Sequence, residues 1–242
     1  MRIPLVYRLG ITLVAISASL LLLNGGIGKR SQHKEPKQFF EMMGHPVLAY
    51  SIIAATSLPE IDEIIVNFPT GYEGKTIDVL KKYAGNKTFK LIECGPDRQN
   101  SSYLLAQQAK NERVLLHEAA RPTVTSAMYQ DLLRHASENV GYFAPIPFSV
   151  CGMDPDTRTI SENIRRDRVF DIQLPQKFKR STLINAHEAA IKRNKKFTED
   201  AVLVFKMSGT KVHMLDGYSN NIKVTSPEDF HIVERVMRGK EI

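Results

Sequence analysis

Cysteine is scarce in this chain. Its 242 residues include only two cysteines, Cys94 and Cys151, and neither forms a Cys-x-x-Cys pair or has a histidine companion. Two cysteines exclude the disulfide framework of a small secreted protein, and their spacing excludes zinc and dithiol redox motifs. We therefore expect a reducing compartment, and we assign no catalytic role to either cysteine.

Two common nucleotide-binding motifs are also missing. A Walker loop needs a glycine five residues before its Gly-Lys pair, but none precedes Gly28 at that distance, and Pro69 stands there for Gly74. We interpret the second site as a surface turn that opens a helix. The G-x-G-x-x-G dinucleotide fingerprint fails because Ser31 stands three residues after Gly28. Any nucleotide site must therefore follow another design.

Nucleic-acid recognition motifs are missing too, although the chain is basic. The formal net charge is +7, from 33 Lys and Arg against 26 Asp and Glu. No RNP-like aromatic motif, helix-turn-helix signal or zinc spacing accompanies this charge, and the seven histidines show no paired metal spacing. A net positive charge suits a triphosphate and a phosphorylated substrate as well as it suits nucleic acid. We therefore expect small anionic ligands and no nucleic acid.

The chain does contain a short apolar run that opens into glycines and cations. Leu20–Leu23 is fully apolar, and Asn24 ends it. The residues that follow are Gly25, Gly26 and Gly28, then Lys29, Arg30, Lys34 and Lys37. Glycines let backbone N–H groups approach oxyanions without interference from a Cβ. The stretch predicts a phosphate-binding loop, and nucleotide chemistry is the first hypothesis.

The first residues of the chain have two interpretations. Arg2 and Arg8, followed by an apolar run from Ile11, imitate the charged and hydrophobic regions of a signal peptide. The run is too short for a comfortable membrane span. The alternative treats residues 1–18 as an N-terminal extension and Leu20–Leu23 as a buried first strand. We favour this alternative because the phosphate loop follows at once.

Strand and helix patterns alternate along the chain up to Ile146. The predicted strands are 20–23, 61–67, 89–93, 114–117 and 142–146, and the predicted helices are 46–57, 76–83, 98–110 and 126–137. This order predicts an α/β, Rossmann-like fold in which a mostly parallel sheet is sandwiched by helices. Ligands of such folds bind outside the carboxyl ends of the strands.

The domain organisation follows from where this alternation stops. Residues 149–175 are polar and rich in Asp and Arg, which predicts an extended β-arm that leaves the sheet. No internal repeat or low-complexity run is visible. We expect a single domain over residues 19–240, preceded by the extension and interrupted by the arm.

Eight short motifs follow one another between Leu20 and Val236. They are Gly26-Ile27-Gly28-Lys29-Arg30, Pro36-Lys37-Gln38-Phe39, Gly44-His45-Pro46-Val47-Leu48, Arg98-Gln99-x-Ser101, His117-Glu118-Ala119-Ala120-Arg121-Pro122, Pro175-Gln176, Thr198-Glu199-Asp200-Ala201 and Asn221-Ile222-Lys223-Val224-Thr225-x-Pro227-Glu228-Asp229. In this order they resemble the cytidylyltransferases typified by 2-C-methyl-D-erythritol 4-phosphate cytidylyltransferase and its CDP-ribitol-forming relatives. The resemblance covers most of the chain.

The resemblance implies a reaction and its ligands. A phosphate oxygen of a sugar-alcohol phosphate attacks the α-phosphorus of CTP, and pyrophosphate leaves, with Mg²⁺ as the cofactor. Such chemistry needs gathered positive charge and alignment rather than a covalent intermediate. The resemblance further implies a cytoplasmic enzyme that has no membrane partner and forms a homodimer through the arm.

Individual residues acquire roles from the same resemblance. Lys37 and Lys223 flank the α-phosphate and Arg30 holds the outer phosphates, as the catalytic residues. The other implied contacts are Gly26, Gly28, Gly95 and Ser101 for the nucleotide, Glu118 for the metal, and Arg121, Arg166 and Thr198 for the acceptor. Structural alternatives stay open: exposed surface lysines, a solvated charged arm at Arg166, and a helix N-terminus at Thr198.

Several positions depart from the family pattern. On the nucleotide side these are Asn24 and Gly25 for two alanines, and Cys94 for a glycine. On the acceptor side, Glu118 replaces an aspartate, Leu174 stands where a threonine usually contacts the substrate, and the Asp-Thr pair expected near Phe148 is missing. The CTP half of the site therefore matches better than the acceptor half.

Three functions fit these observations. The leading one is transfer of CMP from CTP to 2-C-methyl-D-erythritol 4-phosphate in non-mevalonate isoprenoid synthesis, with ribitol 5-phosphate, for CDP-ribitol and surface glycans, as the alternative acceptor. The second is a CTP-binding protein that has lost catalysis. The third is an anchored or exported glycan protein that uses residues 1–23 as its signal.

Overall fold

A seven-stranded sheet forms the centre of the computed structural model, which describes residues 17–26 and 35–239. The strands are β1 (Ala18–Leu23), β4 (Ile61–Phe68), β5 (Thr88–Glu93), β6 (Arg113–Glu118), β7 (Val140–Pro145), β10 (Phe170–Lys179) and β11 (His213–Asp216). They lie in the order β11-β7-β10-β6-β1-β4-β5. Among them only β10 runs antiparallel to its neighbours, β6 and β7. The prediction of a mostly parallel sheet is confirmed.

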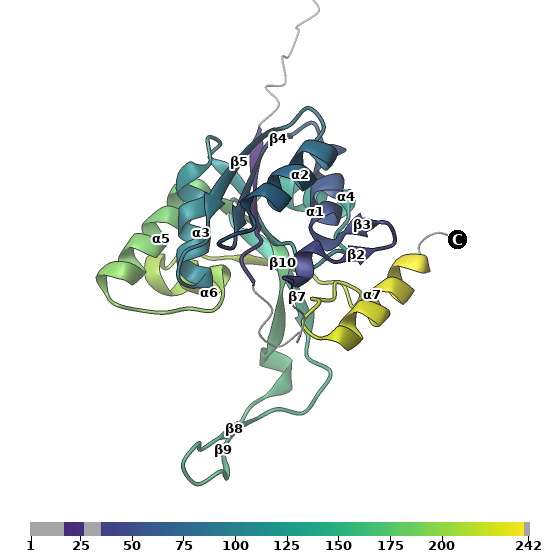
Figure 1. The fold of residues 1–242 in the computed structure, drawn as a ribbon. Helices are drawn as coiled ribbons and strands as arrows, with labels where there is room; N and C mark the ends of the chain where they lie inside the picture. Colours follow the sequence, from purple (N-terminus) through teal and green to yellow (C-terminus); the bar gives the residue numbers. More distant parts are fainter. Residues whose placement is uncertain (1–16, 27–34, 240–242) are drawn as a thin grey trace, which may run out of the picture.

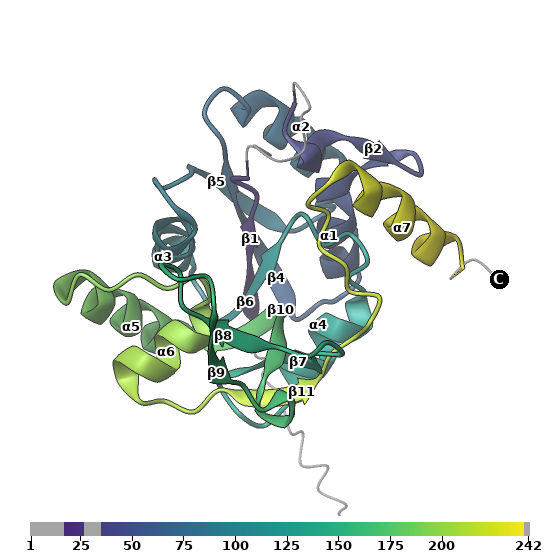
Figure 2. The same cartoon turned by 90° about the horizontal axis from the view of Figure 1, so that it is seen from below.

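Helices cover both faces of this sheet (Figure 2). One face packs against α1 (Val47–Thr56), α2 (Glu73–Tyr83) and α4 (Ser126–Arg134). The other face packs against α3 (Arg98–Gln108), α5 (Arg180–Lys192) and α6 (Asp200–Ser208). The predicted sandwich of helices around the sheet is therefore confirmed.

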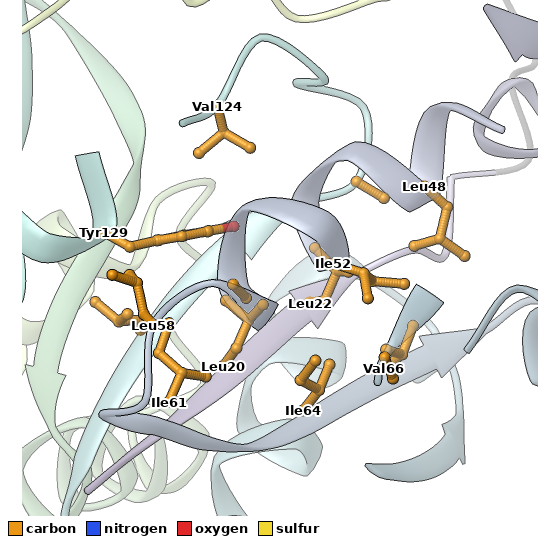
Figure 3. Packing of buried hydrophobic residues seen from close by; sticks show 14 of the residues in the cluster. Leu20, Leu22, Leu48, Ile52, Leu58, Ile61, Ile64, Val66, Val124 and Tyr129 are labelled. Atoms are coloured by element: carbon orange, nitrogen blue, oxygen red, sulfur yellow. The ribbon is translucent and has the colours of Figure 1, made fainter. Parts of the chain in front are cut away.

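Strand β1 supplies side chains to both layers because it lies between β4 and β6. Leu20 and Leu22 belong to the core on the α1 side, whereas Leu21 and Leu23 belong to the core on the α3 side. Figure 3 shows Leu20 and Leu22 near residues of β4 and α1. Burial of both faces explains why this strand is a continuous apolar run.

Two small ribbons stand outside the sheet. β8 (Cys151–Met153) pairs with β9 (Ile160–Asn163) in an arm that projects from the body of the molecule (Figure 1). β2 (Glu41–Met42) pairs with β3 (His45–Pro46), and α7 (Pro227–Arg238) contributes Val233 to the same small core as Met42. The C-terminal helix is thereby attached beside the start of α1.

The predicted elements are present with shifted ends, but two strands of the sheet, β10 and β11, and the helices α5, α6 and α7 were not predicted. α4 ends at Arg134 rather than Ser137, because His135 already has an extended backbone. β10 begins at Phe170, inside the stretch assigned to the arm. Its residues Gln176 and Lys177 are polar but buried in the sheet. This strand therefore lacks the apolar pattern by which a sheet strand is recognised.

The structure does not decide between the two interpretations of the first residues, so the N-terminal extension stays a prediction. Residues 17–26 and 35–239 contain no helix that is long and apolar enough to cross a membrane. β1 begins at Ala18, the last residue of the predicted extension. Residues 1–16 lie outside the described part of the chain.

Candidate active site

A cavity of about 290 Å³ opens at the carboxyl ends of β1, β4 and β6. Its walls come from segments that are far apart in the sequence. The lining residues are 23–26, Lys37, Gln38, Asn67, 94–98, Ser101, 118–120 and Lys223. This is the edge of the sheet at which the fold predicts a ligand.

Glu118 is the last residue of β6, and its buried carboxylate pairs with three cations. Its Oε2 lies 2.9 Å from Lys223 Nζ and 3.6 Å from Arg121 Nε, and its Oε1 accepts a hydrogen bond from Arg98 Nε at 3.2 Å. Burial favours the neutral acid, but Lys223, Arg98 and Arg121 hold the pKa of this carboxyl at about 2. Glu118 is therefore ionised at neutral pH and gathers three positive charges beside the cavity.

Arg98 connects this cluster to the helical layer behind it. It begins α3, and its Nη1 donates to Asp200 Oδ2 at 2.6 Å. Asp200 is buried; its Oδ1 also accepts from Ser102 Oγ at 2.6 Å and lies 3.0 Å from His187 Nε2. Despite burial, Arg98 and these two partners keep the pKa of Asp200 below its usual range. A chain of ionised groups thus runs from Asp200 through Arg98 to Glu118.

Glu199 behaves differently from the two carboxylates near it. Its Oε2 lies 3.4 Å from Arg98 Nη2. Burial raises the pKa of Glu199 to about 7, and the negative charges of Glu118 and Asp200 add to that rise against the pull of Arg98. The protonation of Glu199 therefore changes near neutral pH, at a position next to the Arg98 guanidinium.

The two predicted catalytic lysines come from opposite ends of the chain. Lys37 opens the short 3-10 helix η1 (Lys37–Phe39), and its buried Nζ donates to the carbonyl of Val224. Lys223 directly precedes Val224 and is partly exposed. Both lysines line the same cavity. The fold therefore places two positive charges where an anionic ligand can bind.

The loop after β5 forms another wall. Gly95 N–H donates to Ser101 Oγ at 3.1 Å, and Asp97 caps α3 by accepting the N–H of Asn100 at 2.9 Å. A Cβ on Gly95 would lie 2.7 Å from the Cβ of Asn100, so glycine is required at this close approach. A hydrogen bond thus holds the two predicted nucleotide-binding residues, Gly95 and Ser101, together.

Two departures from the family pattern compensate for each other in space. A Cβ on Gly25 would overlap the Sγ of Cys94. The thiol of Cys94 therefore takes the volume that an alanine methyl group at position 25 would need. Burial raises the pKa of Cys94 to about 11, so the thiol stays protonated and packs as a small apolar group.

Most of the predicted site residues meet at this cavity. The predicted residues that line it are Gly26, Lys37, Gly95, Ser101, Glu118 and Lys223. Arg121 is not part of the lining; it pairs with Glu118, and its Nη1 donates to the carbonyl of Asn221 at 2.7 Å. Gly28 and Arg30 lie outside the described residues.

Two predicted acceptor-binding residues do not line this cavity. Arg166 is exposed on the arm, in the 3-10 turn η2 (Arg166–Arg168), and Thr198 is exposed shortly before α6. The alternative of a helix N-terminus here is confirmed, because α6 begins at Asp200, but the N-cap is Glu199 and not Thr198. Their roles in acceptor binding stay predictions.

Sequence reasoning gave no role to several residues of the cavity. Arg98 stood in a recognised motif, but its pairing with Asp200 spans 102 residues and no local pattern encodes it. Asn67 and Gln38 also line the cavity. The sequence does contain a signal for Asn67, because asparagine is unfavourable within an apolar strand and its presence there is unusual.

Comparisons with known proteins confirm the family that the motifs indicate. A family model described as 2-C-methyl-D-erythritol 4-phosphate cytidylyltransferase matches residues 18–239. The chain belongs to this family. A 2-C-methyl-D-erythritol 4-phosphate cytidylyltransferase from Clostridium botulinum strain Langeland is 33% identical over 229 residues, covering 90% of this chain and 96% of the relative. One from Caldanaerobacter subterraneus subsp. tengcongensis is 32% identical over 230 residues, covering 92% and 100%.

Solved structures of similar fold carry related names. A 4-diphosphocytidyl-2C-methyl-D-erythritol synthase from Anaerococcus prevotii has a TM-score of 0.80 at 23% identity and covers 93% of this chain and 99% of its own. A 2-C-methyl-D-erythritol 4-phosphate cytidylyltransferase from Thermus thermophilus has a TM-score of 0.71 at 24% identity, covering 92% and 98%. The cavity at the ends of β1, β4 and β6 therefore lies in the fold of the cytidylyltransferase family.

We expect Gly25 and Cys94 to be coupled. Gly25→Ala forces the thiol of Cys94 to move, and should lower the free energy of unfolding by about 1 kcal/mol. When position 94 is glycine, the new methyl group meets no sulfur. In the Cys94→Gly background, Gly25→Ala should therefore lower the free energy of unfolding by at most half as much as it does in the wild type. Urea unfolding of all four proteins measures the coupling. Purely additive effects would contradict the compensation.

We expect Glu118→Gln to change stability and its dependence on pH. The pKa of Glu118 falls from its usual 4.5 to about 2 on folding, so its contribution is complete above pH 4.5 and disappears as the pH falls through about 2. The variant leaves three cations without their counter-charge and should lose roughly 3 kcal/mol at pH 7.

Denaturant unfolding between pH 7 and pH 2 measures this effect. The stability of Glu118→Gln should fall less steeply than that of the wild type below pH 4.5, because the variant no longer takes up that proton on unfolding. Glu162→Gln, on the exposed arm, is the control and should follow the wild type. Equal stability and equal acid slopes for Glu118→Gln and the wild type would refute the ionic role of Glu118.

Proposed function

We propose that this chain transfers CMP from CTP to 2-C-methyl-D-erythritol 4-phosphate and releases pyrophosphate, a step of isoprenoid biosynthesis. The observation that carries this proposal is the family match over residues 18–239, together with a cationic cavity at the predicted edge of the sheet. A phosphate oxygen of the acceptor forms the new bond to the α-phosphorus of CTP. The bond from that phosphorus to the oxygen that bridges it to the β-phosphate breaks. Pyrophosphate leaves with this oxygen and the electron pair of the broken bond.

The proposed catalytic work of the protein is to gather charge and align the reacting groups. Lys37 and Lys223 would flank the α-phosphate, where negative charge increases in the transition state. Lys37 is held by its bond to the Val224 carbonyl, and Lys223 is held by Glu118. Since these anchors belong to the protein, little reorganisation is needed when the nucleotide binds. Arg30 would hold the β- and γ-phosphates.

The residues also fit a divalent cation that binds together with the triphosphate. Mg²⁺ is commonly bound through one or two carboxylates plus the phosphates of the substrate. Glu118 supplies an ionised carboxylate at the cavity, and we propose that it would hold the ion. No group of three acidic, histidine or cysteine side chains in residues 17–26 and 35–239 is arranged to hold a metal ion alone. A bound metal would neutralise phosphate charge during transfer.

Binding of the nucleotide and acceptor is proposed to use the remaining predicted residues. Gly26, Gly95 and Ser101 line the cavity and would contact the nucleotide together with Gly28. Arg121, Arg166 and Thr198 would bind the acceptor. The two unpaired cysteines support a reducing, cytoplasmic setting.

Pyrophosphate release from CTP and Mg²⁺ tests the reaction. With 2-C-methyl-D-erythritol 4-phosphate as acceptor we expect turnover, and with ribitol 5-phosphate, offered in parallel, little or none. Lys37→Ala should lower kcat/KM by about 100-fold, the effect of losing one group that stabilises transition-state charge. Lys110→Ala, which removes a surface lysine paired with Asp62, is the matched control. Turnover with ribitol 5-phosphate alone, or with neither acceptor, would contradict the proposal.

A homodimer through the arm is proposed as well. The arm and the residue directly before it carry large apolar side chains that are exposed in the single chain: Phe148 is 72%, Met153 57% and Ile160 77% accessible. A two-stranded ribbon is only marginally stable in water by itself, and exposed apolar clusters mark interaction surfaces. A second copy of this chain would cover these side chains.

Sedimentation of the full chain at micromolar concentration tests the dimer. The wild type should sediment as a dimer, and Ile160→Asp should shift it toward the monomer because a charge enters the apolar contact. Ile191→Asp, at an equally apolar exposed position on α5, is the control and should leave the dimer intact. A monomeric wild type would refute the proposal.

A further inference from the structure

Asn67 is an unusual residue for its position. It lies near the end of β4, directly after the buried residues Ile65 and Val66, and it is fully buried. Asparagine is unfavourable in strands, and a buried amide is destabilising unless it is hydrogen-bonded. A local rule broken in this way often marks a functional position.

The side chain of Asn67 holds the neighbouring strand at the point where it ends. Its Oδ1 accepts the backbone N–H of Asn24 at 2.5 Å. From the other direction Gln38, next to Lys37 in η1, donates its Nε2 to the carbonyl of Asn24 at 2.6 Å. The last described pairing of β1 with β4 joins Leu22 to Val66. After the backbone pairing with β4 ends, hydrogen bonds from two side chains therefore hold the chain. Asn67 binds the N–H of Asn24, and Gln38 binds its carbonyl.

The residues fixed in this way lead into the cavity. Asn24, Gly25 and Gly26 follow β1, and all three line the cavity together with Asn67 and Gln38. The Nδ2 of Asn67 lies 3.8 Å from the position of a Cβ on Gly25. The direction in which Gly25 and Gly26 leave the sheet is therefore set at Asn24.

The amide nitrogen of Asn67, Nδ2, argues against a role in stability alone. Within residues 17–26 and 35–239, Nδ2 of Asn67 is buried and has no hydrogen-bond partner. Leaving such a donor unpaired is destabilising, so this half of the amide contributes nothing to the stability of the core. The benefit of Asn67 must come from the bond that it does make, to the N–H of Asn24.

We propose that Asn67 is a positioning residue for nucleotide binding. By holding the N–H of Asn24, it sets the path of the Gly25–Gly26 turn so that backbone N–H groups of this turn face the phosphates of the nucleotide. The inference rests on the proposed function, because it takes a nucleoside triphosphate as the ligand. It gives a role in nucleotide binding to a residue of β4, next to residues of η1, α3 and the loops that line the same cavity.

CTP binding by the full-length protein tests this role. Asn67→Ala should raise the Kd for CTP with Mg²⁺ about tenfold, as expected when one buried hydrogen bond that aligns the ligand is lost. Isothermal calorimetry measures the affinity without any acceptor, so a failure of catalysis does not obscure the result. The KM for the acceptor should stay within about twofold, because Asn67 lies on the nucleotide side.

Asn139→Ala is the matched control. Asn139 is also buried, and its Oδ1 accepts a backbone N–H, that of Lys179, at 3.2 Å. Asn139 does not line the cavity. Both variants should lower the unfolding temperature, but only Asn67→Ala should weaken CTP binding. If the two variants lose similar stability and both keep the wild-type Kd within about twofold, Asn67 is structural and the proposal is overturned.

Amide hydrogen exchange gives a readout that does not require Asn67→Ala to be stable. Asn67→Asp keeps an oxygen that accepts the N–H of Asn24, so exchange of this amide should stay slow. In Asn67→Ala, or in Asn67→Ser if the alanine variant does not fold, exchange at Asn24 should accelerate at least about tenfold relative to distant strand amides. Unchanged exchange at Asn24 in the alanine or serine variant would overturn the positioning role.

Discussion

The ion pairs of Glu118 are the interaction on which the described part of the site depends. One carboxylate at the end of β6 contacts Lys223, Arg98 and Arg121, which come from the C-terminal segment, from α3 and from the loop after β6. Three like charges so close together would repel one another without it. Glu118 therefore keeps a cationic cavity stable before any phosphate arrives, and an incoming triphosphate can take over the same cations.

The helical layer behind the cavity supports this arrangement. Asp200 holds Arg98 from the N-terminus of α6, and Ser102 and His187 hold Asp200 from α3 and α5. Because all of these groups are buried or half-buried, they are little screened by salt and have few alternative partners. The positions of the cationic groups are thus linked to packing of the α3, α5 and α6 layer, and not only to the loops that line the cavity.

The sequence is sufficient for the elements with a continuous apolar pattern and insufficient for the polar ones. β1 and β6 are recognisable because both of their faces are buried. β10 is not, since its Gln176 and Lys177 are buried and bonded to the carbonyls of Gln173 and His135. For the site, the ordered motifs contain Lys37, Glu118 and Lys223, and all three line the cavity. Contacts such as Arg98 with Asp200 depend on how α3 meets α6, which no local pattern specifies.

The ionisation of Glu118 tests the role of this carboxylate most directly. A titration of the Glu118 side-chain carboxyl by carbon-13 NMR, in the free protein, measures its pKa without any substitution. We expect a midpoint at about 2, because Lys223, Arg98 and Arg121 stabilise the charged form against burial. A midpoint at the usual value of 4.5 or higher would show that the three cations do not hold this carboxylate, and would contradict its central place in the site.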